Sequence, residues 1–317
     1  MSTLDNSALQ DQLDFPVEDG EFVRWESQFR NWITPDGSAG PSGFAGFQAE
    51  PGRYHLYVSY ACPWAHRTLI YRKLKKLEDV VSVSIVNPKM GQVSWDFEDY
   101  PDATGDTLYQ TKFLYELYQQ AMPNFGGVVT VPVLWDKKQK TIVNNESSEI
   151  IRMLNSAFNE FTEEQTDYYP NTLRLAIDEI NDFVYDKINN GVYKTGFARS
   201  QKAYEKAFDQ LFFALDELEK RLDSQPYLAG DVITEADWRL FPTLVRFDSV
   251  YVGHFKCNLR RIADYPNLYK YLCKLHHYPG IVETVNMDHI KTHYYWSHDS
   301  INPSRIVPKG PAVLFNS

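Results

Sequence analysis

The sequence has little cysteine, no long apolar run and no excess of positive charge. Only three cysteines occur among its 317 residues, Cys62, Cys257 and Cys273, and their odd number and wide spacing exclude a disulfide framework. A reducing, cytoplasmic setting is therefore expected. The net charge of −10 argues against nucleic-acid partners and anionic membrane surfaces. Nowhere do about 18 apolar residues follow one another, so no bilayer-spanning segment is predicted.

The length of the chain predicts about two domains. Residues 1–50 lack a sustained apolar period, and the Gly-rich stretch 35–46 predicts a mobile loop within an extended N-terminal arm. Residues 51–160 show alternating strand and helix patterns, whereas residues 161–317 show helical periodicity. We therefore expect an arm, an α/β domain and an all-helical domain with a C-terminal extension.

The α/β segment has the element order of a thioredoxin-like domain. Its first strand and second strand are separated by a helix, which implies parallel pairing. The predicted elements are strand 54–60, helix 65–77, strand 80–86, an insert 88–127 with a short helix 108–120, strands 128–135 and 141–144, and helix 146–154. In the helical half, Thr234 and Asp237 have the spacing of a capping box, and Pro266 and Pro279 bracket a further helix.

Cys62 lies where the first strand gives way to the first helix, in the sequence Cys-Pro-Trp-Ala. Unpaired N–H groups and the positive end of a helix dipole favour the thiolate, which is the nucleophilic form. Pro63 suits the first helical position, and His66 and Arg67 add positive potential. The alternative is a structural cysteine that only fills space, which this position at a helix start disfavours.

Dithiol oxidoreductases carry a second cysteine at the fourth place of this motif, where this chain has Ala65. A mixed disulfide on Cys62 therefore has no neighbouring thiol to resolve it, since Cys257 and Cys273 lie in the helical half. The resolving thiol must come from solution, and glutathione is the abundant one.

Two further stretches fit a glutathione site. Val131-Pro132 starts a strand at a candidate cis peptide, which leaves the Val131 backbone free to pair with a peptide-like ligand. Glu146 and Ser147 open a helix, where the N–H groups and Ser147 suit a carboxylate and Glu146 suits an ammonium group. A γ-glutamyl head carries both charges on one carbon. A plain N-cap explains the second stretch equally well when it is taken alone.

Together these residues resemble the glutathionyl-hydroquinone reductases, also called Xi-class glutathione transferases, which are related to the omega class. The resemblance covers nearly the whole chain beyond Arg24. The stretches that carry it are 60–67 (YACPWAHR), 131–136 (VPVLWD), 144–149 (NNESSE), 191–197 (GVYKTGF), 246–251 (RFDSVY) and 288–294 (DHIKTHY).

The resemblance implies the glutathione transferase fold, a thioredoxin-like domain followed by an all-α domain. It implies that Cys62 removes glutathione from a glutathionylated hydroquinone and that a second glutathione regenerates the thiol, releasing oxidised glutathione. It assigns glutathione binding to Trp95, Val131, Glu146 and Ser147. Tyr193, Tyr251 and Tyr294 would line the aromatic site and donate hydrogen bonds to the quinol, although with 21 tyrosines any one of them is more often a packing residue.

The resemblance also implies a homodimer. At one position this sequence departs from the pattern of the family. Many members carry an arginine where this chain has Val128, which puts one contact to a glutathione carboxylate in question. No metal site is predicted, because the histidines of the C-terminal half come without a closely spaced cysteine pair or an HExxH motif.

Two other functions stay open on the residues alone. A general omega-like thiol transferase or dehydroascorbate reductase needs only the Cys62 site. A non-catalytic binding protein on the same fold would need no reactive thiol, and Cys62 argues against it.

Overall fold

A computed structural model describes residues 17–91, 93–312 and 315 of the protein. The chain forms two compact units that are discontinuous in sequence. The first unit contains Trp25–Gln165 and Asn286–His293, and the second contains residues 17–24, Thr166–Val285 and the described residues from Tyr294 onward. The division of the sequence at residues 50 and 160 stays a prediction.

A four-stranded mixed sheet forms the centre of the first unit. The strands are β3 (Tyr54–Val58), β4 (Ser82–Ile85), β5 (Val133–Asp136) and β6 (Thr141–Asn144), in the order β4-β3-β5-β6. β3 pairs parallel to β4 and antiparallel to β5, and every residue of β3 and β5 is buried. The two central strands are thus covered on both faces, as expected of continuously apolar strands.

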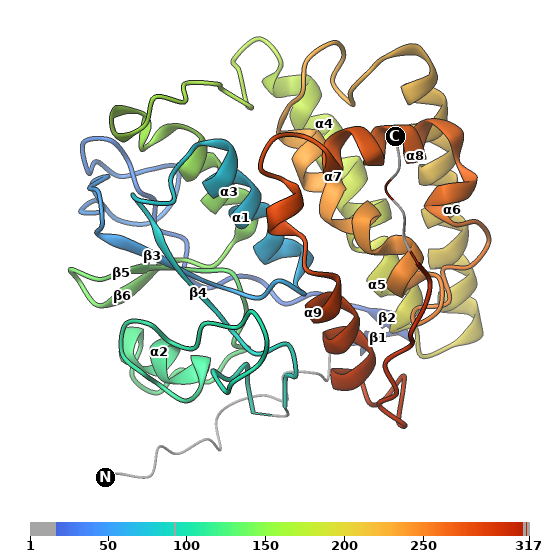
Figure 1. The fold of residues 1–317 in the computed structure, drawn as a ribbon, viewed down its shortest axis with the longest axis horizontal. Helices are drawn as coiled ribbons and strands as arrows, with labels where there is room; N and C mark the ends of the chain where they lie inside the picture. The colour runs from blue at the N-terminus through green and yellow to red at the C-terminus, as the bar shows by residue number, and fades with distance from the viewer. Residues whose placement is uncertain (1–16, 92, 313–314, 316–317) are drawn as a thin grey trace. The chain divides into compact units, whose positions relative to one another are not determined.

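Three helices flank this sheet. Helix α1 (Pro63–Leu74) packs against α3 (Ser147–Ser156), and α2 (Leu114–Ala121) contacts β6. Figure 1 shows α1 and α3 on one side of the strands and α2 on the other. The predicted β-α-β, insert, β-β-α order is confirmed.

Most predicted boundaries differ from the structure by one to three residues, and the two largest differences have identifiable reasons. Helix α2 begins after residue 113 rather than at 108, because the Asp106 carboxylate accepts the N–H groups of Leu108, Tyr109 and Thr111 and holds that stretch as a turn. Strand β5 begins at Val133 rather than at 128, directly after Pro132, which has no N–H for a ladder.

In the described residues of the second unit, the strands are the short pair β1 (Val17–Glu18) and β2 (Glu21–Phe22), and the other regular elements are helices. Its α-helices are α4 (Arg174–Val184), α5 (Gly191–Gly196), α6 (Gln201–Ser224), α7 (Glu235–Arg246) and α8 (Pro266–His276). The predicted capping box is confirmed at α7, where Thr234 N donates to Asp237 Oδ2 at 2.7 Å. Short 3₁₀ turns are η1 (Asn159–Phe161), η4 (Ile262–Asp264) and η5 (Val282–Thr284), of which η1 belongs to the first unit.

Three π-helical turns follow helices directly. They are η2 (Tyr185–Asn189) after α4, η3 (Phe247–Tyr251) after α7, and η6 (His293–Ser297) after α9 (Met287–Thr292). Such turns are rare and frequently lie at functional sites. Two of them carry tyrosines that the sequence placed in the aromatic site.

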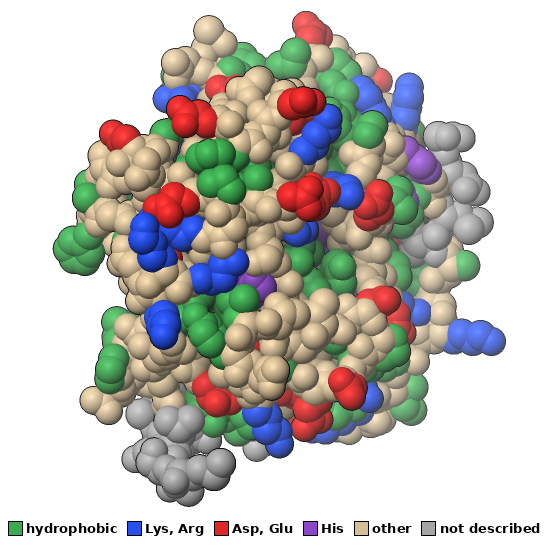
Figure 2. All heavy atoms as spheres, turned by 60° about the vertical axis from the view of Figure 1, so that its left-hand side comes forward, with side chains coloured by type: hydrophobic (Ala, Val, Ile, Leu, Met, Phe, Trp, Pro, Cys, Tyr) green, Lys and Arg blue, Asp and Glu red, His purple; other side chains and the backbone are tan. Residues whose placement is uncertain are grey.

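Within the described residues, no helix has both the length and the apolar character that crossing a bilayer requires. On the face drawn in Figure 2, Lys and Arg side chains lie among Asp and Glu side chains. This face therefore presents charges of both signs side by side.

Candidate functional site

Cys62 is the N-cap of α1, as the sequence predicted. Pro63 occupies the first turn, and the His66 N–H donates to the Cys62 carbonyl at 2.9 Å, closing the first turn of the helix. The thiol is partly exposed, and its Sγ donates to the Val131 carbonyl oxygen at 3.5 Å. The nucleophile candidate and the proposed peptide-pairing residue thus lie side by side in the first unit.

The other two cysteines have different surroundings. Cys257 and Cys273 lie in the second unit and are 0% and 2% exposed. Burial raises the pKa of both thiols above the ordinary cysteine value. Both therefore remain neutral thiols at physiological pH, which leaves Cys62 as the candidate for nucleophilic chemistry.

Glu146 is the N-cap of α3 and is held by serine side chains. Its carboxylate accepts the Ser148 N–H at 3.0 Å, the Ser148 hydroxyl at 2.9 Å and the Ser27 hydroxyl at 3.0 Å. Burial by itself would raise the pKa of Glu146, but these hydrogen bonds and the nearby charge of Arg67 bring it below its ordinary value. Glu146 is therefore an anion at neutral pH, as an ammonium-binding residue must be.

Ser147 follows as the first residue of α3 and is 3% exposed. Arg67, one turn beyond Cys62 on α1, donates from Nη1 to Ser147 Oγ at 3.4 Å. The N-cap carboxylate and the adjacent hydroxyl therefore lie at the same helix start, beside a buried cation.

Val131 and Trp95 complete the set of predicted glutathione residues. The Val131–Pro132 peptide is cis, which confirms the prediction. Among the described residues, the Val131 N–H has no hydrogen-bond acceptor. Trp95 is 5% exposed, and its ring stacks on that of His293 with centroids 4.6 Å apart and planes at 23°. His293 Nδ1 is 2.9 Å from the Pro88 carbonyl oxygen, so the stacking partner is itself anchored.

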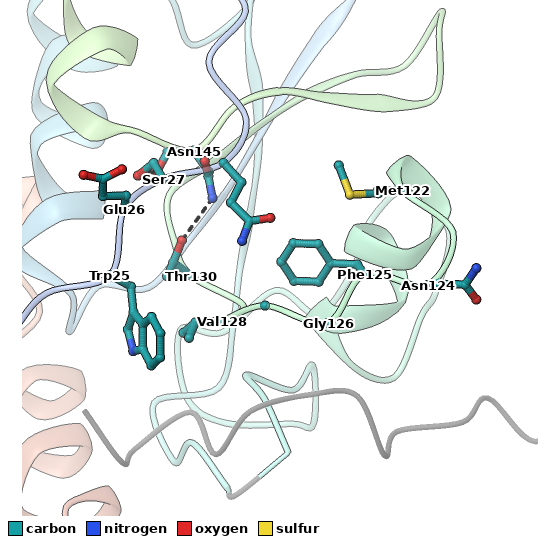
Figure 3. Close-up of a pocket in the computed structure, with 12 residues that line it drawn as sticks. Trp25, Glu26, Ser27, Met122, Asn124, Phe125, Gly126, Val128, Thr130 and Asn145 are labelled. Atoms are coloured by element: carbon teal, nitrogen blue, oxygen red, sulfur yellow. Dashed lines mark hydrogen bonds between the residues drawn. The ribbon is translucent and has the colours of Figure 1, made fainter. Parts of the chain in front are cut away.

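A pocket of about 280 Å³ opens next to these residues in the first unit. Figure 3 shows Ser27, Thr130 and Asn145 on one side of it and Met122, Asn124 and Phe125 on the other. Thr130 and Asn145 immediately precede Val131 and Glu146 in the sequence. Val128, where the resemblance leads us to expect an arginine, also lines this pocket.

The three predicted tyrosines meet in the second unit. Tyr294 Oη lies 2.6 Å from Tyr193 Oη and 3.0 Å from Tyr251 Oη, and all three side chains are at most 6% exposed. Tyr193 comes from α5, whereas Tyr251 and Tyr294 come from the π turns η3 and η6. Their proximity cannot be read from local sequence patterns, because the three residues are far apart along the chain.

Burial, reinforced by the neighbouring tyrosines, raises the pKa of Tyr251 and Tyr294 well above 10. Both phenols are therefore hydrogen-bond donors at physiological pH and not bases. Phe255 packs against all three rings, with centroids 5.4 to 5.6 Å away. A Cβ on Gly196 would overlap the Phe255 ring, so this approach requires glycine.

Several residues around these sites were missed by sequence reasoning. Ser27 donates to Glu146 from an arm segment without periodicity, and His293 stacks on Trp95 from the far end of the chain. Arg24 places its guanidinium carbon 4.8 Å from the Tyr193 ring centroid, beside Phe22. The aromatic content of the arm was the one available signal. Among the described residues, no group of three or more His, Cys, Asp or Glu side chains is placed to hold a metal ion.

Comparisons with known proteins agree with this geometry. Residues 61–157 match the model of the glutathione S-transferase N-terminal domain, and residues 201–272 match that of the C-terminal domain. The chain is 59% identical over 293 residues to the glutathionyl-hydroquinone reductase YqjG of Escherichia coli, covering 92% of this chain and 89% of the relative. The chain belongs to the Xi class of glutathione transferases.

Further relatives support the class. This Xi-class transferase is 54% identical to the glutathionyl-hydroquinone reductase PcpF of Sphingobium chlorophenolicum, over 92% of this chain and 90% of the relative. The crystal structure of the glutathione-S-transferase Xi from Phanerochaete chrysosporium superimposes with a TM-score of 0.90 at 55% identity, covering 96% and 98% of the two chains. The glutathione-bound structure of YqjG also gives a TM-score of 0.90, at 58% identity and 92% and 94% coverage. The predicted fold class, a thioredoxin-like domain plus an all-α domain, is confirmed.

The burial of two cysteines predicts selective alkylation of the transferase. Iodoacetamide at pH 7 should modify Cys62 and leave Cys257 and Cys273 unmodified in the folded protein, because neither thiol is accessible or ionised. Peptide mass spectrometry measures each site. Unfolding in urea should expose all three cysteines, and labelling of Cys257 in the folded protein as fast as Cys62 would contradict the assignment.

The low pKa of Glu146 predicts a flat pH dependence of ligand binding. A carboxyl whose pKa is lowered stays ionised above that pKa, so the affinity for S-methylglutathione should change by less than about twofold between pH 7 and pH 5. Glu146→Gln should weaken binding about tenfold at both pH values. Calorimetry measures both effects.

A matched control for this experiment is Glu149→Gln. Glu149 lies on the same helix but forms an ion pair with Arg30, and its substitution should leave affinity unchanged. A loss of affinity in the parent protein already between pH 7 and pH 5 would show that Glu146 is not the ionised partner.

Proposed function

We propose that this protein is a glutathionyl-hydroquinone reductase. Glutathione is its co-substrate, and a glutathionylated aromatic quinol is its substrate. The observation that carries the proposal is Cys62 at the start of α1, with its Sγ beside Val131 and with Ala65 in place of a resolving cysteine. The relatives YqjG and PcpF carry this activity in their names.

The reaction proceeds in two steps, a thiolate attack that breaks a carbon–sulfur bond and a thiol–disulfide exchange. The Cys62 thiolate attacks the sulfur that joins glutathione to the quinol ring, so a sulfur–sulfur bond forms and the carbon–sulfur bond breaks. The ring carbon takes the electron pair and a proton and leaves as hydroquinone. A second glutathione thiolate then attacks the mixed disulfide, Cys62 leaves as a thiolate, and oxidised glutathione is released. The quinol is reduced and two glutathione molecules are oxidised to one disulfide.

The first unit supplies the residues for glutathione. Glu146 is an anion suited to the γ-glutamyl ammonium group, and Ser147 at the start of α3 suits the neighbouring carboxylate. The Val131 backbone suits antiparallel pairing with the cysteinyl unit, next to Cys62 Sγ. Trp95 and Pro132 belong to the same proposed site.

The second unit supplies the donors. A departing aryl carbon is a poor leaving group, so protonation and hydrogen bonds to the quinol oxygens lower the barrier. The Tyr294 hydroxyl lies within hydrogen-bonding distance of the Tyr193 and Tyr251 hydroxyls, and raised pKa values keep Tyr251 and Tyr294 protonated. We assign these tyrosines as the donors to the quinol oxygens.

Substitution of the tyrosines distinguishes this reaction from general thiol transfer. Tyr→Phe at residues 193, 251 and 294 keeps each ring and removes its hydroxyl. Each variant should cleave glutathionyl-hydroquinones about 10²–10³-fold more slowly in kcat where the donor is well placed. The same variants should reduce a small glutathione mixed disulfide almost normally, because a sulfur leaving group needs no such donor. Steady-state assays on the two substrates give the comparison.

Two control variants show whether a loss of activity is specific to the tyrosine cluster. Cys62→Ser should abolish turnover of both substrates, whereas Tyr204→Phe, on α6 and outside the cluster, should affect neither. Equal losses on both substrates in the cluster variants would favour an omega-like thiol transferase or dehydroascorbate reductase. Full activity in Cys62→Ser would contradict the Cys62 mechanism, whereas no turnover of either substrate by the parent protein would favour a non-catalytic binding protein.

The protein is also proposed to act as a cytoplasmic homodimer. Its three free cysteines suit a reducing compartment, and closed twofold dimers are the commonest oligomers. Light scattering at micromolar concentration should give twice the mass of the 36.8 kDa chain. A monomeric mass at that concentration would contradict this assembly.

A further inference from the structure

The guanidinium of Arg67 occupies an unusual position for an arginine. It is 1% exposed and lies on α1, the helix that begins at Cys62. Its central carbon is 4.6 Å from the Trp64 ring centroid, and its Nη1 is 3.4 Å from Ser147 Oγ at the start of α3. Removing a guanidinium from water is costly, and the Glu146 carboxylate, the Trp64 ring and the Ser147 hydroxyl are among the groups that offset this cost.

The direction of the hydrogen bond between Arg67 and Ser147 is fixed by chemistry. Arginine has five N–H donors and no acceptor, so Ser147 Oγ must accept. The hydroxyl proton of Ser147 is then left to be donated elsewhere. Among the described residues, Arg67 is the one hydrogen-bond partner of Ser147 Oγ, although the hydroxyl is buried. The pair therefore presents an oriented O–H donor backed by a positive charge.

The neighbouring Glu146 presents the opposite charge, and its side chain is an acceptor and not a donor. Its carboxylate is already held by Ser27 and Ser148. One helix start thus offers an anion at residue 146 and a cation-backed donor at residue 147, one residue apart. An α-amino acid head carries an ammonium and a carboxylate on one carbon. The Glu146 carboxylate suits the ammonium group, and the Ser147 hydroxyl suits the carboxylate.

We propose that Arg67 is a positioning residue for glutathione, which orients the Ser147 hydroxyl toward the γ-glutamyl α-carboxylate and supplies the positive charge behind it. This inference rests on the proposed function, in which Glu146 and Ser147 hold the γ-glutamyl head. It adds that the helix carrying the nucleophile also sets the selectivity for an α-carboxylate. Arg67 acts through Ser147 and takes no part in the thiol exchange.

The experiment compares three ligands, all S-methylated so that no thiol exchange occurs. They are glutathione, an analogue without the α-carboxylate (4-aminobutanoyl-cysteinylglycine) and an analogue without the ammonium (glutaryl-cysteinylglycine). Arg67→Met should weaken glutathione and the glutaryl analogue about tenfold, as expected for a hydrogen bond to a charged group. It should leave the aminobutanoyl analogue unchanged. Arg67→Lys, which keeps the charge, should restore part of the loss.

Arg72→Met is the matched control. Arg72 lies on the same helix, but its guanidinium donates to the Val81 and Glu78 carbonyl oxygens. Its loss should not distinguish between the three ligands. Equal weakening of all three by Arg67→Met, or no weakening of any, would overturn the inference.

Glu146→Gln and Ser147→Ala separate this inference from the proposed site. If both variants bind glutathione normally, the head-group site itself is wrong. If both weaken binding while Arg67→Met does not, the site holds and only the role of Arg67 fails.

Discussion

The packing of α1 against α3 is the constraint on which the first unit's chemistry depends. Each helix begins at a residue of the proposed site, Cys62 in one case and Glu146 in the other. Because the two helices contact each other directly, a sulfur and a carboxylate from distant parts of the sequence are held in one rigid unit. Rigid elements position reacting groups more accurately than loops do.

A different principle organises the second unit. Two of its three clustered tyrosines lie where a helix changes its winding, since Tyr251 ends η3 and Tyr294 lies in η6. A π turn moves a side chain away from the position that a regular α-helix would give it. The close approach of Phe255 at Gly196 then fills the space behind the rings. Buried phenols with raised pKa values follow from this packing, and so does their capacity to act as donors.

The sequence predicted the helices and strands better than the contacts between side chains that are far apart along the chain. Local rules were sufficient for Cys62, Pro63 and the capping box at Thr234, because each depends on residues a few positions apart. They failed where a side chain reorganised the backbone, as Asp106 does before α2. They could not supply Ser27 beside Glu146 or His293 beside Trp95, since such pairs depend on tertiary packing between distant segments. The tyrosine cluster was accessible through the family resemblance and not through periodicity.

The segment Asn286–His293 belongs to the first unit although most of the second unit precedes it in the chain. Its side chains form hydrogen bonds with three residues of the insert after β4. His293 Nδ1 lies 2.9 Å from the Pro88 carbonyl oxygen, and His289 Nε2 lies 2.5 Å from the Pro101 carbonyl oxygen. Tyr100 Oη donates to Asp288 at 2.8 Å. The ribosome synthesises this segment after residues 166–285 of the second unit. The first unit therefore cannot complete its packing when its own sheet is formed, because His293 stacks on Trp95 only after residues 166–285 have been synthesised. Completion of the Trp95 side of the site is thus coupled by chain connectivity to the arrival of Tyr294, the residue that follows His293.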